Sequence, residues 1–121
     1  MPPAQPSTHC MIDHIRPAQL PAWFAAAGPR PLVLDVREPW ERQTASVHAQ
    51  GFELLAIPMG ALPASLATLD PARAIACLCH HGTRSLRVAE FLAQHGFDRV
   101  ANITGGIDAW SQEIDPAVPR Y

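Results

Sequence analysis

The stretch AIACLCHHGTRSLRVAEFLAQHG, residues 74–96, places a short apolar run before a polar loop and a helical pattern. Residues 74–79 are almost wholly apolar, which is typical of a β-strand buried on both faces of a parallel sheet. Beyond the loop, apolar residues stand at 86, 88, 89, 92 and 93, the spacing of one helix face, and Gly96 is suited to end that helix. A buried strand followed by an amphipathic helix predicts an α/β fold.

Strands and helices alternate along the rest of the chain as well. Strands are predicted at 11–15, 31–37, 53–58, 74–79 and 99–104, and helices at 16–28, 60–70, 85–96 and 107–114. The polar stretch 38–50 is typical of turns, and the tail 115–121 of an extended segment that packs back on the domain. Right-handed crossovers between such strands give a parallel sheet with helices on both faces.

The length of 121 residues fits one domain with a substantial core. The first ten residues are rich in proline and polar groups, so we expect a flexible leader at 1–10 and a folded domain at 11–121. No apolar run approaches the roughly 20 residues that a membrane helix needs. The N-terminal residues lack the basic and apolar regions of a secretion signal. We therefore expect a cytoplasmic protein with no membrane partner.

The formal net charge is −2, and the nine residues of the Lys and Arg class are all arginines. A nucleic-acid surface needs an excess of basic residues, so a nucleic-acid partner is not expected. Because there is no lysine, Schiff-base chemistry on a lysine amine is excluded. Three cysteines, an odd number, in a chain without a secretion signal indicate cytosolic thiols and not a disulfide framework.

The loop CHHGTRS, which begins at Cys79, combines a thiol with groups that favour an anion. Cys79 is predicted to end its strand, at the sheet edge where α/β proteins bind ligands. Gly82 lets the backbone curl with its N–H groups inward, and the next helix directs its free N–H groups and dipole to the same place. Cysteines at helix N-termini can have strongly lowered pKa values. Arg84 adds a positive charge and Thr83 or Ser85 a hydroxyl, so we expect an exposed, anionic sulfur seated here.

Four segments, in order along the chain, resemble the rhodanese family. They are LDVREPWE (34–41), AIPMGALP (56–63), CHHGTRS (79–85) and ITGGIDAW (103–110). The third stands in the place of the family's Cys-x-x-Gly-x-Arg-Ser loop. From about residue 11 to 121 the sequence looks like a single rhodanese domain, the fold of sulfurtransferases that carry a persulfide. The tail IDPAVPRY is similar to rhodanese domains fused to the adenylating enzymes that activate sulfur-carrier proteins.

The resemblance implies a three-layer α/β/α fold with a five-stranded parallel sheet in the order 1-5-4-2-3. It also implies a sulfurtransferase of the thiosulfate:cyanide type, with no cofactor. Cys79 would attack the outer sulfur of thiosulfate or of a donor persulfide and hold it as a persulfide, stabilised by the loop amides. The sulfur would then pass to an acceptor thiol, a carboxyl-terminal acyl group or cyanide. A protein persulfide donor, such as a cysteine desulfurase, and a sulfur-carrier protein are the implied partners.

The loop length and the residues after the nucleophile bear on the substrate. Four residues separate Cys79 from Arg84. Phosphatases and arsenate reductases of this fold carry one more, so the shorter loop favours sulfur transfer over phosphate-ester hydrolysis. The family often has arginine directly after the nucleophile, where this chain has His80 and then His81. A histidine, with a reference pKa of about 6.5, gives partial charge, so we expect a protein-bound persulfide to serve better than thiosulfate.

The candidate site has a nucleophile, a substrate-binding loop and a supporting pair. The nucleophile is Cys79, and the supporting pair is Asp35 and Arg37. The substrate-binding loop consists of His80, His81, Gly82, Thr83, Arg84 and Ser85. Arg84 is expected to bind loop carbonyls or a carboxylate, or to contact the anion itself. Ser85 is as suited to a helix cap as to a catalytic donor, and the two histidines either touch substrate or face solvent. Asp35 and Arg37 are predicted to end the second strand. The resemblance suggests that they organise the surroundings of the site, and the interpretation we favour is a structural ion pair with Arg84 or the loop.

Several residues near the motifs have plainer interpretations. Cys77 lies inside the apolar run and is expected to be a core thiol and not a resolving one. Cys10 lies in the leader and is expected to have no role. Glu38 and Glu41 are expected to be solvated turn residues, while Trp40 could wall the pocket.

Two other classes of function stay open at the level of sequence. A metal-binding module could use Cys77 and the adjacent Cys79, His80 and His81, with His9, Cys10 and His14 elsewhere. Adjacent side chains cannot easily all reach one tetrahedral ion, so no metal is expected. The other class is a non-catalytic rhodanese-like module that binds or regulates a partner; such domains generally lose the nucleophile, which this chain keeps.

Overall fold

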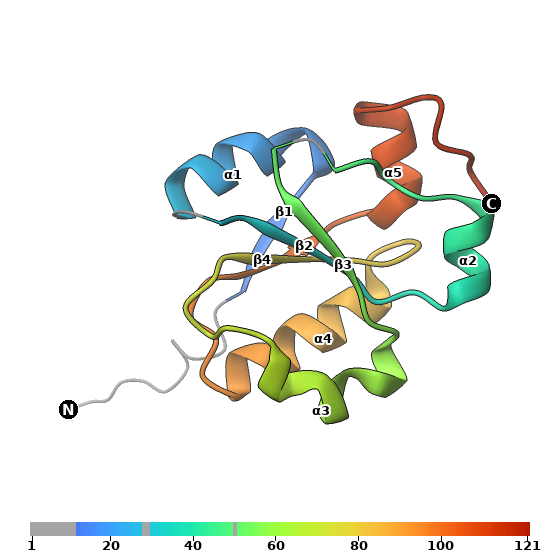
Figure 1. The fold of residues 1–121 in the computed structure, drawn as a ribbon. Helices are drawn as coiled ribbons and strands as arrows, with labels where there is room; N and C mark the ends of the chain where they lie inside the picture. Colours follow the sequence, from blue (N-terminus) through green and yellow to red (C-terminus); the bar gives the residue numbers. More distant parts are fainter. Residues whose placement is uncertain (1–11, 28–29, 50) are drawn as a thin grey trace.

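Figure 1 shows a computed structural model in which five strands lie between two layers of helices. It describes residues 12–27, 30–49 and 51–121, so the predicted leader at 1–10 lies outside the described residues. The strands are β1 (Asp13–Ile15), β2 (Leu32–Asp35), β3 (Glu53–Ala56), β4 (Ile75–Leu78) and β5 (Val100–Ile103). The α-helices are α1 (Leu20–Ala27), α2 (Pro39–Thr44), α3 (Leu62–Ser65), α4 (Thr83–Gln94) and α5 (Gly106–Glu113).

All strand pairs are parallel, and the order in the sheet is β1-β5-β4-β2-β3. The predicted α/β/α fold and strand order are thereby confirmed. Asp35 pairs with Leu78, and Cys77 pairs with Asn102. Because these strands run the same way, the segments that follow β2, β4 and β5 emerge side by side at one edge of the sheet.

The two faces of the sheet are buried by different helices. Leu32 and Leu34 belong to a core that includes residues of α3 and α4, whereas Val33 belongs to a second core with α1 and α5. In Figure 1 these two pairs of helices lie on opposite sides of the sheet. Continuous apolar strands therefore arise because side chains on both faces are removed from water.

The structure differs from the sequence expectations in several elements. The strand expected at 31–37 ends at Asp35, so Arg37 lies two residues beyond β2 and does not end it as predicted, and the helix expected at 16–28 begins with a 3₁₀ turn at Pro17–Gln19. Helix α2 lies inside the polar stretch that was expected to form turns; Pro39 is its first residue, and Glu41 accepts a hydrogen bond from the Glu38 N–H, which satisfies a free donor at its start. The helix expected at 60–70 is three short pieces: a 3₁₀ turn at Met59–Ala61, α3, and a second 3₁₀ turn at Leu66–Thr68. The strand expected at 53–58 ends earlier, at Ala56.

Within the described part of the chain, every helix falls short of the length and apolar character needed to span a bilayer.

Candidate active site

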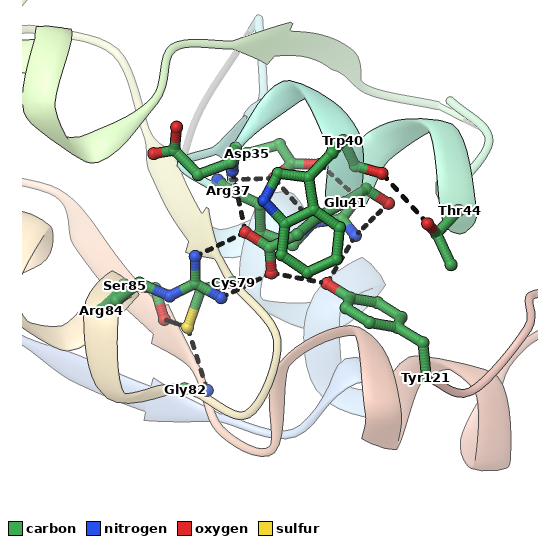
Figure 2. Close-up of polar contacts among 11 residues, drawn as sticks. Asp35, Arg37, Trp40, Glu41, Thr44, Cys79, Gly82, Arg84, Ser85 and Tyr121 are labelled. Carbon is green, nitrogen blue, oxygen red and sulfur yellow. Dashed lines mark hydrogen bonds and ion pairs between the residues drawn. The ribbon is translucent and has the colours of Figure 1, made fainter.

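Strand β4 ends at Leu78, so Cys79 lies directly after the strand, whereas it was predicted to be the last strand residue. The Gly82 N–H donates a hydrogen bond to its Sγ at 3.1 Å, and the Ser85 Oγ lies 3.2 Å from the same sulfur (Figure 2). The residue is 1% exposed, which corrects the expectation of an exposed sulfur. The loop curls over the thiol, so the sulfur is buried but faces polar hydrogen-bonding groups at the start of α4.

Gly82 gives the loop its shape. Its φ of 105° is left-handed, and a Cβ there would stand 3.1 Å from the Gly105 nitrogen, so a side chain would be strained and crowded. The Asn102 Nδ2 donates to the Gly82 carbonyl at 3.2 Å, and the Ser85 Oγ donates to the Asn102 Oδ1 at 2.5 Å. Asn102 was not among the predicted site residues. In the sequence, Asn102 stands out as the one polar residue of the apolar run VANI, which forms β5, and the structure buries it.

Ser85 is placed to respond to the charge on Cys79. It is the third residue of α4, with Gly82 in the capping position, so it is not the helix cap. A hydroxyl has one hydrogen, which Ser85 gives to Asn102 here, so the neutral Cys79 thiol is the donor in the contact between them. When the thiol is deprotonated, rotation of the Ser85 hydroxyl lets it donate to the sulfur anion.

The start of α5 holds the carbonyl groups of the loop. The Ile107 N–H donates to the Cys79 carbonyl at 2.9 Å, and the Asp108 N–H donates to the His80 carbonyl at 3.2 Å. Gly106 makes this approach possible, because a Cβ there would stand 2.4 Å from both carbonyl oxygens. The carbonyl oxygens are thereby bound to α5, while the Gly82 N–H is directed to the sulfur.

Arg84 binds a carboxylate, which was one of its predicted roles. The carboxylate is that of Glu41 in α2, a residue that was not predicted to be in the site. Two parallel bonds of 2.7 Å join the guanidinium to the Glu41 oxygens (Figure 2). These bonds lower the pKa of Glu41 to about 2, against the opposing effect of burial. The expectation that Glu41 is solvated was wrong: its side chain is 3% exposed, because α2 turns it toward α4.

Asp35 and Arg37 form a buried ion pair with each other, with Nη2 and Oδ2 2.7 Å apart, and not with Arg84 or the loop as expected. Arg37 also donates to the Glu41 carbonyl oxygen at 3.3 Å and to the Tyr121 hydroxyl at 3.0 Å. The Tyr121 hydroxyl in turn donates to the Glu41 carboxylate at 2.9 Å. The pair is thus connected to Arg84 through two residues that were not predicted to be in the site.

The two histidines after Cys79 are stacked. The ring of His80 lies between the rings of His81 and Tyr121, each with a centroid 3.9 Å away. Burial lowers the pKa of His80, and the neighbouring His81 lowers it further. The position after Cys79 therefore holds a ring with less positive charge at neutral pH than a free histidine.

The remaining candidates are Cys77, Thr83, Trp40 and Cys10. Cys77 is fully buried in the core, and burial raises the pKa of its thiol, as expected of a core cysteine. Thr83 is an exposed first residue of α4. Trp40 is 62% exposed and meets the Tyr121 ring edge-on, with centroids 6.2 Å apart. Cys10 lies outside the described residues.

The described residues contain no group of three or more His, Cys, Asp or Glu side chains arranged to hold a metal ion. Cys77, one of the ligands that the metal-binding interpretation would use, is sealed in the core.

Several known proteins are similar in sequence. The chain is 40% identical over 91 residues to the rhodanese-like/PpiC domain-containing protein 12 of Arabidopsis thaliana, a chloroplastic protein, covering 74% of this chain and 30% of that one. It is 37% identical over 93 residues to the adenylyltransferase and sulfurtransferase MOCS3-2 of Zea mays, covering 74% of this chain and 19% of that one. It is 34% identical over 89 residues to a sulfurtransferase of Allochromatium vinosum, covering 72% of this chain and 78% of that one. The chain thus spans less than a third of the two plant proteins.

The fold also matches a solved structure. A rhodanese-related protein of Thermoplasma volcanium superimposes with a TM-score of 0.71 at 33% identity, over 90% of this chain and 99% of that one. A family model described as the rhodanese-like domain matches residues 17–113, which include α2, the loop after β4 and the start of α5. The chain therefore belongs to the rhodanese-like domain family.

Proposed function

We propose that the protein is a sulfurtransferase that carries sulfane sulfur as a persulfide on Cys79. The observation that carries this proposal is the seat of the sulfur at the start of α4, 3.1 Å from the Gly82 N–H and 3.2 Å from the Ser85 hydroxyl. Backbone N–H groups and the positive end of a helix favour a sulfur anion. Membership of the rhodanese-like family and a relative named sulfurtransferase that aligns over most of its length support the same activity.

The reaction has two displacement steps. The Cys79 thiolate attacks the outer sulfur of the donor, a new S–S bond forms, and the old bond breaks with its electron pair leaving on the donor, as sulfite from thiosulfate or as a thiolate from a persulfide. An acceptor thiolate or cyanide then attacks the outer sulfur, and Cys79 leaves as the thiolate. With an activated acyl acceptor, the outer sulfur instead attacks the acyl carbon and expels the activating group; a second thiol then reduces the S–S bond to Cys79, frees the thiocarboxylate and is itself oxidised to a disulfide. With a thiolate or cyanide as acceptor, each step exchanges one bond to sulfur for another and needs no external oxidant or reductant; only the acyl acceptor needs the second thiol as reductant.

The loop residues have distinct roles in this reaction. The Gly82 N–H and the rotated Ser85 hydroxyl stabilise negative charge on sulfur. Asn102 orients Ser85 and the Gly82 carbonyl. Arg84 is bound to Glu41 and thereby ties the loop to α2. The hydrogen bond to the sulfur comes from the backbone N–H of Gly82 and not from Arg84.

The test is the intact mass of the protein after incubation with thiosulfate, or with a cysteine desulfurase and cysteine. We expect a gain of one sulfur atom in the wild-type protein and none in Cys79→Ser. Cys10→Ser and Cys77→Ala are the matched controls and should keep the gain, since the first lies outside the described fold and the second is sealed in the core. A gain that persists in Cys79→Ser would refute the assignment.

We further propose a protein-bound persulfide as the preferred donor. The position after the nucleophile holds His80, whose pKa is lowered by burial and then by His81, so it offers thiosulfate no fixed cation. A donor such as a cysteine desulfurase brings its own binding surface and needs less charge in the loop. The resemblance of the tail to rhodanese domains fused to adenylating enzymes, together with similarity to a maize protein named adenylyltransferase and sulfurtransferase, is the ground for proposing a sulfur-carrier protein as acceptor.

Steady-state kinetics with the two donors test this preference. We expect kcat/KM for the desulfurase-bound persulfide to exceed that for thiosulfate by at least about tenfold. His80→Arg, which supplies a fixed cation, should raise the ratio of kcat/KM for thiosulfate to kcat/KM for the persulfide, because loss of the His80 ring affects turnover of both donors alike whereas the added charge favours thiosulfate. Efficient turnover of sub-millimolar thiosulfate by the wild-type protein would overturn the proposal.

The burial of Cys79, at 1% exposure, is the observation that favours the second candidate, a non-catalytic module that binds or regulates a partner. The same mass measurement decides between them, because a module without chemistry gains no sulfur from either donor.

A further inference from the structure

Tyr121 joins segments that lie far apart in the sequence. Its hydroxyl donates to the Glu41 carboxylate of α2 and accepts from Arg37, which follows β2. Its ring stacks on His80, with centroids 3.9 Å apart and planes 10° from parallel. Figure 2 shows the tyrosine reaching from the tail toward the Glu41 and Arg84 pair. One side chain thus contacts both the loop that carries the nucleophile and the residue that anchors Arg84.

The stack on His80 has a direct route to the nucleophile. His80 follows Cys79 in the chain, and its carbonyl is held by the Asp108 N–H of α5 at 3.2 Å. With the carbonyl bound on one side and the ring held between Tyr121 and His81, the peptide groups on both sides of His80 have little freedom. The Gly82 N–H, two positions after His80, is directed at the sulfur from this held segment.

We propose that Tyr121 is a positioning residue of the Cys79 loop, acting through the contact of its ring with His80. The hydroxyl serves a separate purpose, since its bonds to Arg37 and Glu41 tie the tail to the body of the domain. The inference rests on the proposed function only for its effect on turnover; its effect on the order of the loop does not depend on sulfur chemistry.

Two variants separate the ring from the hydroxyl. Tyr121→Phe keeps the stacked ring and removes the hydroxyl, whereas Tyr121→Leu keeps apolar bulk and removes the stack. We expect amide hydrogen exchange in the loop that follows Cys79 to be about tenfold faster in Tyr121→Leu and close to wild type in Tyr121→Phe. Exchange in β2 should not change in either variant. Arg120→Gln is the control in the same segment. The Arg120 side chain is exposed and contacts the Asp108 carboxylate, not the Asp108 N–H that holds the loop, so loop exchange should stay close to wild type.

His80→Ala removes the other half of the stack. It should speed loop exchange about tenfold by itself, and Tyr121→Leu should add nothing to it, because both changes remove the same contact. If Tyr121→Leu does not fold, His80→Ala and Tyr121→Phe still decide the matter. Unchanged loop exchange in His80→Ala or Tyr121→Leu, additive effects in the double variant, or equal acceleration in Tyr121→Phe would each overturn the inference.

A second readout separates this inference from the proposed function. In Tyr121→Leu, kcat for sulfur transfer should fall about tenfold with little change in KM, and Tyr121→Phe should restore most of it. If the wild-type protein transfers no sulfur, the proposed function fails, while the loop exchange still tests the role of Tyr121. If transfer occurs and loop exchange does not respond, the positioning role alone is refuted.

Discussion

Gly106 is the residue on which the contact between α5 and the loop depends. Its φ is 58°, and a Cβ would meet the carbonyl oxygens of Cys79 and His80 at 2.4 Å, closer than any ordinary contact. Both oxygens are backbone atoms, which cannot turn away as a side chain could. A methyl group here therefore has to move α5 or the loop.

Gly106→Ala should lower the free energy of unfolding by at least about 2 kcal/mol, because it combines overpacking with left-handed backbone strain. Urea denaturation measures this, and sulfur transfer should fall with it. Gly60→Ala is the matched control, since nothing lies within 4 Å of its Cβ position and its φ is not left-handed. Equal stability of the two variants would contradict the role given to Gly106.

At the scale of elements, the strands and α4 could be predicted from the sequence because each has a strong local pattern. Apolar runs mark strands with two buried faces, and the spacing of Val88 and Leu92 marks the buried face of α4. Helix α2 could not be predicted in this way, since it is six residues long and mostly polar, and its buried side chain is the charged Glu41. That residue is buried because the fold supplies Arg84 as a partner.

The same reasoning divides the site. Cys79, Gly82 and Ser85 lie within one strand-loop-helix segment, so their proximity follows from local structure and could be predicted. Glu41 meets Arg84 from 43 positions away, and Tyr121 meets Glu41 from 80 positions away. Contacts over such separations depend on how α2 and the tail pack, which no local pattern of residues specifies.

At the scale of the whole molecule, Glu41 makes stability depend on pH. It connects α2 to α4 and to the tail, and its pKa in the folded protein is about 2, below its usual 4.5. The folded protein therefore favours the ionised form of Glu41, and ionisation of Glu41 stabilises the fold. This stabilisation is complete above about pH 4.5 and is lost as the pH falls toward 2.

Glu41→Gln should be clearly less stable than the wild-type protein at pH 7, and the difference should shrink as the pH falls from 4.5 to 2. Denaturation in urea at a series of pH values measures both curves. Glu53→Gln is the matched control, because Glu53 also pairs with an arginine, Arg73, but has a side chain 60% exposed; such a pair contributes little at any pH. A constant gap between wild type and Glu41→Gln across this range would contradict the assignment.

The way in which the loop is held has a consequence for synthesis of the protein. Its hydrogen-bonding partners are Asn102 on β5 and the first N–H groups of α5, and its stacking partner is Tyr121. All of these are translated after Cys79. On the ribosome, the Cys79 thiol therefore emerges before the groups of β5, α5 and the tail that hold its loop, and the loop takes its folded form only after those segments have docked.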